Sequence, residues 1–165
     1  MSIDIPDFLH TMSRVPGPVT VATTADRLGH RWGFTGSSFS SLSVTPPLVL
    51  ICLDKQASTH DAFTTAEHFL VNVLAHDQAD IARHFARSGV DRFATGVMQP
   101  RELGLPGLAD PAARVACALH DVLDGGDHSI LVGRVESAYA GERSPLVYWD
   151  RTFAQPVTDQ LAGSR

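Results

Sequence analysis

The chain has 165 residues, of which 44% are hydrophobic and 19% are charged, and its formal net charge is −5. This length predicts one domain with a single buried core, and the composition excludes the disordered and fibrous classes of protein. The acidic balance leaves no surplus of Lys and Arg for a phosphate backbone, so we expect no nucleic-acid partner.

The N-terminus and the hydrophobic pattern predict a cytoplasmic protein that does not enter a membrane. Residues 1–8 (MSIDIPDF) carry acids in place of the apolar core of a secretory signal, and no apolar run approaches the ~18 residues that span a bilayer. Cys52 and Cys117 each lie in an apolar run, so we interpret both as small buried hydrophobic residues rather than a redox or metal-binding pair.

The first third of the chain predicts a short helix and then a β-hairpin. Asp4 or Asp7 can cap a helix that ends near Arg14, and residues 16–18 (Pro-Gly-Pro) break it. Residues 19–23 alternate as a strand, residues 26–30 make a turn, and the return strand carries Trp32 and Phe34. After a bend at residues 46–47, residues 48–53 are apolar on both faces, which is typical of a strand inside a closed sheet.

The remaining elements favour a small antiparallel barrel decorated by helices. We expect helices at 59–66 and 77–87 (N-cap Asp77), strands at 69–74 and 146–149, and a hairpin formed by 114–124 and 129–139. Residues 88–113 form a long Gly- and Pro-rich connection, which is more often a functional lid or binding loop than plain linkage. One domain over residues 1–154 and a frayed tail at 155–165 complete this interpretation.

A run of hydroxyl side chains is the most informative feature of the sequence. Five hydroxyls occur within seven residues, at Thr35, Ser37, Ser38, Ser40 and Ser41. Phe34 and Phe39 lie within this run, which indicates that the donors sit beside a core rather than in a solvated turn. Lys55, the only lysine, is followed by Ser58 and Thr59, a second set of donors suited to a phosphate, although an ordinary strand-end cation is the alternative.

The segment G-F-T-x-S-S-F-x-S-x-S-x-x-P-P-L-V-L, which begins at Gly33, closely resembles the signature of the short-chain flavin reductases. These proteins are the reductase halves of two-component flavin monooxygenases. Residues 12–14, 18–24, 69–74, 91–93 and 126–128 resemble other parts of the family in the expected order, so the resemblance covers roughly residues 8–150.

The resemblance implies an FMN-binding split barrel and an NAD(P)H:flavin oxidoreductase. Hydride would pass from NADH or NADPH to N5 of FMN or FAD, and the reduced flavin would go to a partner oxygenase; a homodimer is the usual assembly. The resemblance assigns cofactor contacts to Thr35, Gly36, Ser37, Ser38, Ser41, Asp54, Lys55, Ser58, Thr59, Asn72 and Phe93. Among these, Ser41, Lys55, Ser58 and Thr59 would hold the phosphate, but Ala57 stands where the family has a small hydroxyl, which weakens the assignment of Ser58.

Alternation along a strand cannot aim Thr35 and Ser38 the same way, so we expect a backbone irregularity near Gly36. The predicted site has several hydroxyls, at most one lysine and no arginine beside it in sequence. Such a site is compatible with a moderate affinity for flavin, which allows the flavin to be released. A flavin carrier that oxidises no nicotinamide, and an oxidase or oxygenase with tightly held FMN, are the alternative functions.

The nicotinamide has no Rossmann site in this sequence, because no G-x-G-x-x-G follows a strand. His128, in Gly-Gly-Asp-His-Ser, matches the family's G-D-H histidine and is the candidate catalytic residue that orients the nicotinamide. We expect no metal site. His68, His76 and His84 recur every eight residues, which is too far apart for two of them to share an ion on one helix. The loop around Gly125 contains aspartates but is too short to be an EF-hand loop.

Overall fold

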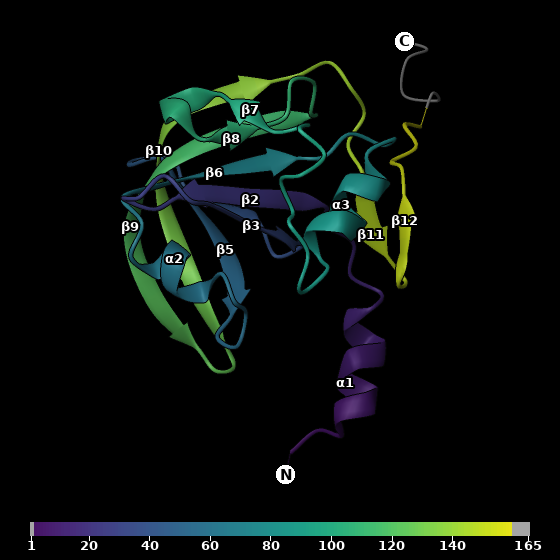
Figure 1. Ribbon diagram of the computed structural model, residues 1–165. Helices are drawn as coiled ribbons and strands as arrows, with labels where there is room; N and C mark the ends of the chain where they lie inside the picture. The colour runs from purple at the N-terminus through teal and green to yellow at the C-terminus, as the bar shows by residue number, and fades with distance from the viewer. Residues whose placement is uncertain (1, 160–165) are drawn as a thin grey trace.

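The computed structural model describes residues 2–159, which form a mainly β protein with short helices on its surface (Figure 1). The predicted tail extends beyond this range, so its residues 160–165 lie outside the described residues. The helices are α1 (Ile5–Met12), α2 (His60–Thr64), α3 (Ala79–Phe85) and the short 3-10 helix η1 (Glu102–Gly104). The strands are β1 (Gly17–Pro18), β2 (Thr20–Ala25), β3 (Arg31–Gly36), β4 (Ser40–Ser43), β5 (Leu48–Asp54), β6 (His68–Val73), β7 (Gln99–Pro100), β8 (Pro106–Gly107), β9 (Ala113–Gly125), β10 (His128–Ala140), β11 (Val147–Trp149) and β12 (Thr152–Ala154).

Seven strands form one antiparallel sheet in the order β3-β2-β6-β9-β10-β5-β4, which curls into an incomplete barrel (Figure 1). No ladder joins the edge strands β3 and β4 in the described part of the chain. Near this seam the hydroxyl of Ser38 contacts β5, where its Oγ accepts the backbone N–H of Cys52 at 2.9 Å. The expected barrel-like β fold is confirmed, and its seam lies beside the hydroxyl run.

The hydrophobic core lies inside this curled sheet. Alternate residues of β5 are buried there, namely Val49, Ile51 and Leu53, while the residues between them are half covered. The long hairpin β9–β10 bends around the core through register shifts at Val132/Gly133 and Val135/Ser137. A Cβ atom at Gly133 would lie 2.6 Å from the ring of Phe69, so only glycine lets this bend close on the core.

The helices and the last strands differ from the sequence prediction in detail. Helix α3 begins after Gln78, so the assignment of Asp77 as its N-cap is wrong; the carboxylate of Asp77 instead pairs with Arg143. The structure also adds β12, which pairs with β11 across a two-residue turn at Asp150 and Arg151. None of the helices within residues 2–159 has the length and apolarity of a membrane span.

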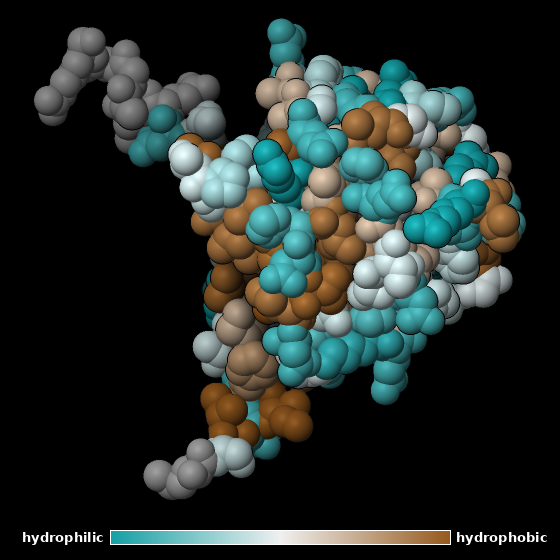
Figure 2. Space-filling view, turned by 90° about the vertical axis from the view of Figure 1, so that its left-hand side faces the viewer, coloured by the Kyte–Doolittle hydropathy of each residue, from teal (hydrophilic) through white to brown (hydrophobic). Residues whose placement is uncertain are grey.

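Helix α1 projects from the body and buries none of its residues (Figure 1). Its exposed apolar side chains are Ile5, Phe8, Leu9 and Met12. Figure 2 shows hydrophobic surface on this projection and on the body above it. Behind α1 the chain is tied to β11 and its turn: Trp149 Nε1 donates to the carbonyl of Arg14, and the Arg14 guanidinium lies 3.3 Å from the Asp150 carboxylate.

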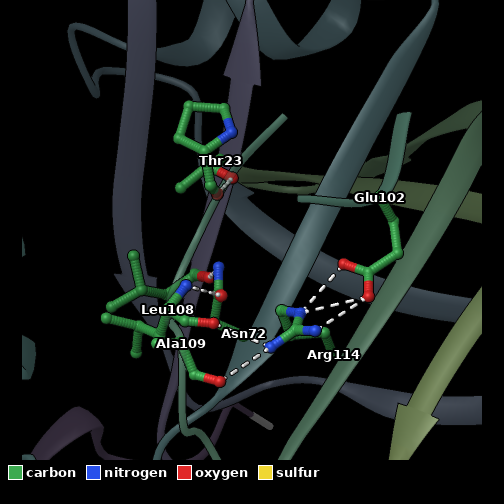
Figure 3. A network of polar contacts seen from close by, with 8 residues as sticks. Thr23, Asn72, Glu102, Leu108, Ala109 and Arg114 are labelled. Carbon is green, nitrogen blue, oxygen red and sulfur yellow. Dashed lines mark hydrogen bonds and ion pairs between the residues drawn. The ribbon is translucent and has the colours of Figure 1, made fainter. Parts of the chain in front are cut away.

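The long connection at residues 88–113, expected to be a lid or a binding loop, divides into two parts. Its second part is fixed to the sheet by a polar network centred on Arg114, which is almost fully buried (Figure 3). Arg114 pairs with Glu102 at 2.9 Å and donates to the carbonyl of Leu108 at 2.7 Å, while Asn72 Oδ1 accepts the Leu108 N–H at 2.9 Å. These hydrogen bonds offset the cost of burying the Arg114 guanidinium and the Asn72 amide. The first part, from Ser88 to Arg92, lies beside the cavity described next.

Candidate functional site

A cavity of about 720 Å³ opens between β3, β5 and α3, a size typical of small-molecule sites. Its walls come from four parts of the chain. They are residues 34–38, residues 52–54 with 56–59, the end of α3 and the loop after it (residues 85–86, 88–89 and 92), and His128. His128 reaches this cavity because β10 pairs with β5 and places His128 opposite Asp54.

Eight of the residues predicted to form the site line this cavity together. They are Thr35, Gly36, Ser37, Ser38, Asp54, Ser58, Thr59 and His128. Strand β3 ends at Gly36, which is the expected irregularity, so Ser37 and Ser38 follow it without strand alternation. Two of the hydroxyls bond to backbone: Thr35 Oγ1 donates to the carbonyl of Ala82 at 2.6 Å, and Ser38 Oγ bonds to Cys52. Ser37 keeps its hydroxyl free of hydrogen bonds within residues 2–159 and is therefore available to a ligand.

Four predicted contacts lie outside this cavity. Asn72 is fully buried between sheet and connection, where its amide bonds to Val21 and Leu108. Ser41 lies on the edge strand β4, opposite Val49. The Lys55 ammonium pairs with Asp124 at the tip of the β9–β10 hairpin. Phe93 lines a smaller neighbouring cavity and packs edge-on against Phe85, with ring centroids 5.2 Å apart.

The cation of the cavity is Arg92, which the sequence interpretation missed. Its Nη1 donates to the carbonyl of Gly33 at 2.6 Å and its Nε to that of Arg87 at 3.0 Å. Burial lowers the pKa of this guanidinium from its ordinary value, yet an arginine so far above neutrality stays charged. The available signal was the Asp-Arg-Phe segment, of which only Phe93 was assigned. Arg92 supplies the positive charge that the sequence interpretation expected from Lys55.

Thr59 carries an unsatisfied hydroxyl beside this cation. The residue is 2% exposed, and its Oγ1 has no hydrogen-bond partner within residues 2–159. A buried hydroxyl without a partner costs about 1–3 kcal/mol, so such groups are rare unless a ligand satisfies them. Thr59, Ser58 and Arg92 together offer hydroxyl and guanidinium donors, the set that binds a phosphate.

His128 is held in place by its neighbour Asp127. Its Nδ1 lies 2.7 Å from the Asp127 carboxylate, and the imidazole lowers the pKa of that carboxyl. With Nδ1 donating to Asp127, Nε2 of the neutral ring is an acceptor for an N–H donor such as a carboxamide. The cavity therefore combines a fixed imidazole and a phosphate-binding set with apolar walls at Phe34, Leu53 and Phe85. These residues fit the ring, ribityl chain and phosphate of a flavin.

A comparison of the sequence with models of protein families identifies the family of this chain. The model of the flavin reductase like domain matches residues 12–156. The chain belongs to the flavin reductase family. The resemblance seen in the sequence is thus confirmed, and this family member shares its barrel with solved flavin reductases.

Two curated relatives and one solved structure illustrate the kinship of this flavin reductase family member. A protein named actinorhodin polyketide dimerase, from Streptomyces coelicolor, is 42% identical over 87% of this chain and 81% of its own length. The reductase component of a 4-nitrophenol 4-monooxygenase/4-nitrocatechol 2-monooxygenase from Rhodococcus opacus is 39% identical over 94% of this chain and 83% of its own. The structure of an NADH:FAD oxidoreductase from Streptomyces globisporus, in complex with NAD and FAD fragments, has a TM-score of 0.88, 34% identity and coverage of 97% and 99%.

Proposed function

We propose that this chain is an NAD(P)H:flavin oxidoreductase that reduces FMN or FAD and supplies the reduced flavin to a partner oxygenase. The observation that carries the proposal is one cavity in which the unsatisfied Thr59 hydroxyl and Arg92 lie together with His128. The family membership supports it, as do one relative named as the reductase component of a monooxygenase and another named as an NADH:FAD oxidoreductase. Reduced flavin as a released product requires an acceptor, which is the role of the oxygenase.

The residues divide into three tasks in this proposal. Arg92, Ser58 and Thr59 hold the phosphate, and the free hydroxyl of Ser37 serves the ribityl chain or the ring edge. His128 Nε2 accepts a hydrogen bond from the carboxamide of the nicotinamide and so orients it. The bound flavin supplies the two-electron acceptor, while the protein contributes alignment and the exclusion of water.

An anaerobic titration with NADH, repeated with FMN and with FAD, tests this function. The loss of the visible absorbance of oxidised flavin, in stoichiometric amounts, is the expected result. A flavin carrier would bind flavin and leave it oxidised, and an FMN-dependent oxidase would stay yellow after dialysis. Either outcome contradicts the proposal.

The substitution His128→Ala tests the role of the histidine. Loss of one hydrogen bond to the nicotinamide should lower kcat/KM for NADH by about tenfold and leave flavin affinity unchanged. His120→Ala, at an exposed position of β9 outside the cavity, is the matched control. Wild-type kinetics in the His128 variant would remove this residue from the site.

We also propose that the protein is a homodimer that covers α1. An isolated helix of eight residues is marginal in water, and α1 contributes no buried residue to its own chain, so a second copy is the occupant that completes it. A groove of about 630 Å³ beside α1, lined by Leu9, Met12 and Trp149 among others, offers the apolar surface. Sedimentation should give a dimer for the unchanged chain and a monomer for Phe8→Glu; a monomeric unchanged chain contradicts the proposal.

A further inference from the structure

The loop of residues 55–60, which we call the donor loop because it carries two of the phosphate-binding hydroxyls, is tied at both ends to the start of strand β10. At its first end the backbone N–H of Lys55 donates to the carbonyl of Asp127 at 3.0 Å. At its last end Nε2 of His60 lies 2.9 Å from the hydroxyl oxygen of Ser129. A serine hydroxyl can donate or accept, so this hydrogen bond forms with either neutral tautomer of the imidazole.

The two ties reach the residues on either side of His128. Asp127 precedes His128 in the chain and Ser129 follows it. On the donor loop, Ser58 and Thr59 lie between the two tied ends. The donors assigned to the flavin phosphate and the imidazole assigned to the nicotinamide are thus joined by one short path of bonds. A displacement of the donor loop against β10 would change the spacing between the two ligand sites.

The side chains that form the second tie do not line the main cavity themselves. Ser129 is 5% exposed and the His60 side chain is 19% exposed, so their hydrogen bond is largely shielded from water. Helix α2 has a separate anchor: Phe63 is fully buried, and its ring packs edge-on against Phe34 with centroids 4.8 Å apart. Phe63 lies three residues along the helix, so it holds α2 on the barrel without fixing the first residue of the helix against β10.

We propose that His60 is a positioning residue, which acts through Ser129 to hold the phosphate donors at a fixed distance from His128. The inference rests on the proposed function, because it takes the roles of these donors and of His128 from it. Without the bond to Ser129, the last end of the donor loop is held by main-chain bonds internal to the loop and α2, such as that from the N–H of His60 to the carbonyl of Ala57 at 3.0 Å. These bonds keep the turn but set no position against β10. Because the alignment of two bound reactants depends on such spacing, binding of flavin and use of NADH should both respond.

Titrations of the flavin-free protein with FMN and with riboflavin, which lacks the phosphate, test this role. His60→Ala removes the bond and should raise the Kd for FMN about 3- to 10-fold, while it changes that for riboflavin by less than about twofold. With FMN kept saturating, kcat/KM for NADH should fall by a similar factor. His60→Gln is the conservative variant: its amide nitrogen can take the place of Nε2, so it should keep most of the affinity for FMN.

Two further variants separate positioning from a general loss of stability. Thr24→Val removes a buried hydrogen bond from β2 to the carbonyl of His68, outside the cavity, and should leave both Kd values unchanged. Ser129→Ala should match His60→Ala, and the double variant should be no weaker than either single one, because both remove the same bond. If His60→Ala does not fold, Ser129→Ala gives the same comparison.

A His60→Ala variant that unfolds more easily but binds FMN as the unchanged chain does would make the bond a structural contact and overturn the proposal. Equal weakening of FMN and riboflavin, or a His60→Gln variant as weak as His60→Ala, would overturn it as well. The titrations need no turnover, so the proposed function fails separately, if the unchanged protein binds FMN and NADH leaves it oxidised.

Discussion

The substitution Thr59→Val separates a ligand-binding hydroxyl from a structural one, because its expected effects on stability and on affinity have opposite signs. Thr59 Oγ1 is buried and unpaired, and although Thr59 occupies the N-cap position of α2, its side chain makes no capping hydrogen bond. Replacing the hydroxyl with a methyl group of similar size thus removes an unsatisfied group and no interaction. We expect the flavin-free protein to gain about 1 kcal/mol in its free energy of unfolding, or roughly 2–4 °C in Tm.

Flavin binding should respond in the opposite direction. A hydrogen bond from a hydroxyl to a charged phosphate contributes about 1.5–3 kcal/mol, so its loss should raise the Kd about 10- to 100-fold. Thermal unfolding without flavin and a flavin titration measure the two effects. Thr24→Val is the matched control: Thr24 is equally buried, but its Oγ1 donates to the carbonyl of His68 at 2.7 Å, so this variant should lose stability and keep its affinity. A destabilised Thr59 variant with unchanged Kd would refute the reasoning.

Two further predictions concern groups away from the cavity. Glu102→Gln should cost about 1–3 kcal/mol at pH 7, because it leaves the buried Arg114 without its carboxylate. Since Arg114 lowers the pKa of Glu102 in the folded protein, this stabilisation is complete above the unfolded pKa and is lost as the pH falls through the folded one; denaturant unfolding at pH 7 and pH 3 should show the difference shrinking. Burial raises the pKa of the Cys117 thiol to about 12, so iodoacetamide should label Cys117 only after unfolding, whereas the partly exposed Cys52 can react in the native protein; a modified Cys117 in a digest of the native protein would contradict its buried placement.

Strong local patterns in the sequence predicted most of the fold. The alternation in residues 19–23 and the glycine pair of the β9–β10 turn were sufficient to place β2 and the long hairpin. The β11–β12 hairpin gave no such signal, because its turn residues Asp150 and Arg151 adopt positive φ angles of 51° and 60° without a glycine. The N-cap of helix α3 is Gln78, one residue later than predicted, and Asp77 instead pairs with Arg143, a partner that lies far away in the sequence.

The candidate site was predictable where its residues are neighbours in sequence or are carried by a motif, as with Ser37, Thr59 and His128. The residue that carries the positive charge of the site was not predictable, because tertiary folding decides which basic side chain reaches the cavity. Lys55, three residues before Ser58, was the obvious candidate, but its ammonium pairs with Asp124 at the tip of the β9–β10 hairpin. Arg92 lies in the Asp-Arg-Phe segment, but that segment does not show where the side chain goes; the carbonyls of Gly33 and Arg87 fix its orientation at the cavity.

This fixation of Arg92 bears on how a flavin enters and leaves. The guanidinium is anchored by two main-chain acceptors before any ligand arrives, so its side chain would lose little conformational entropy when a phosphate binds. Under the proposed function, a cation positioned in advance favours a flavin that exchanges with solution, and delivery to a partner oxygenase would then depend on the lifetime of the complex.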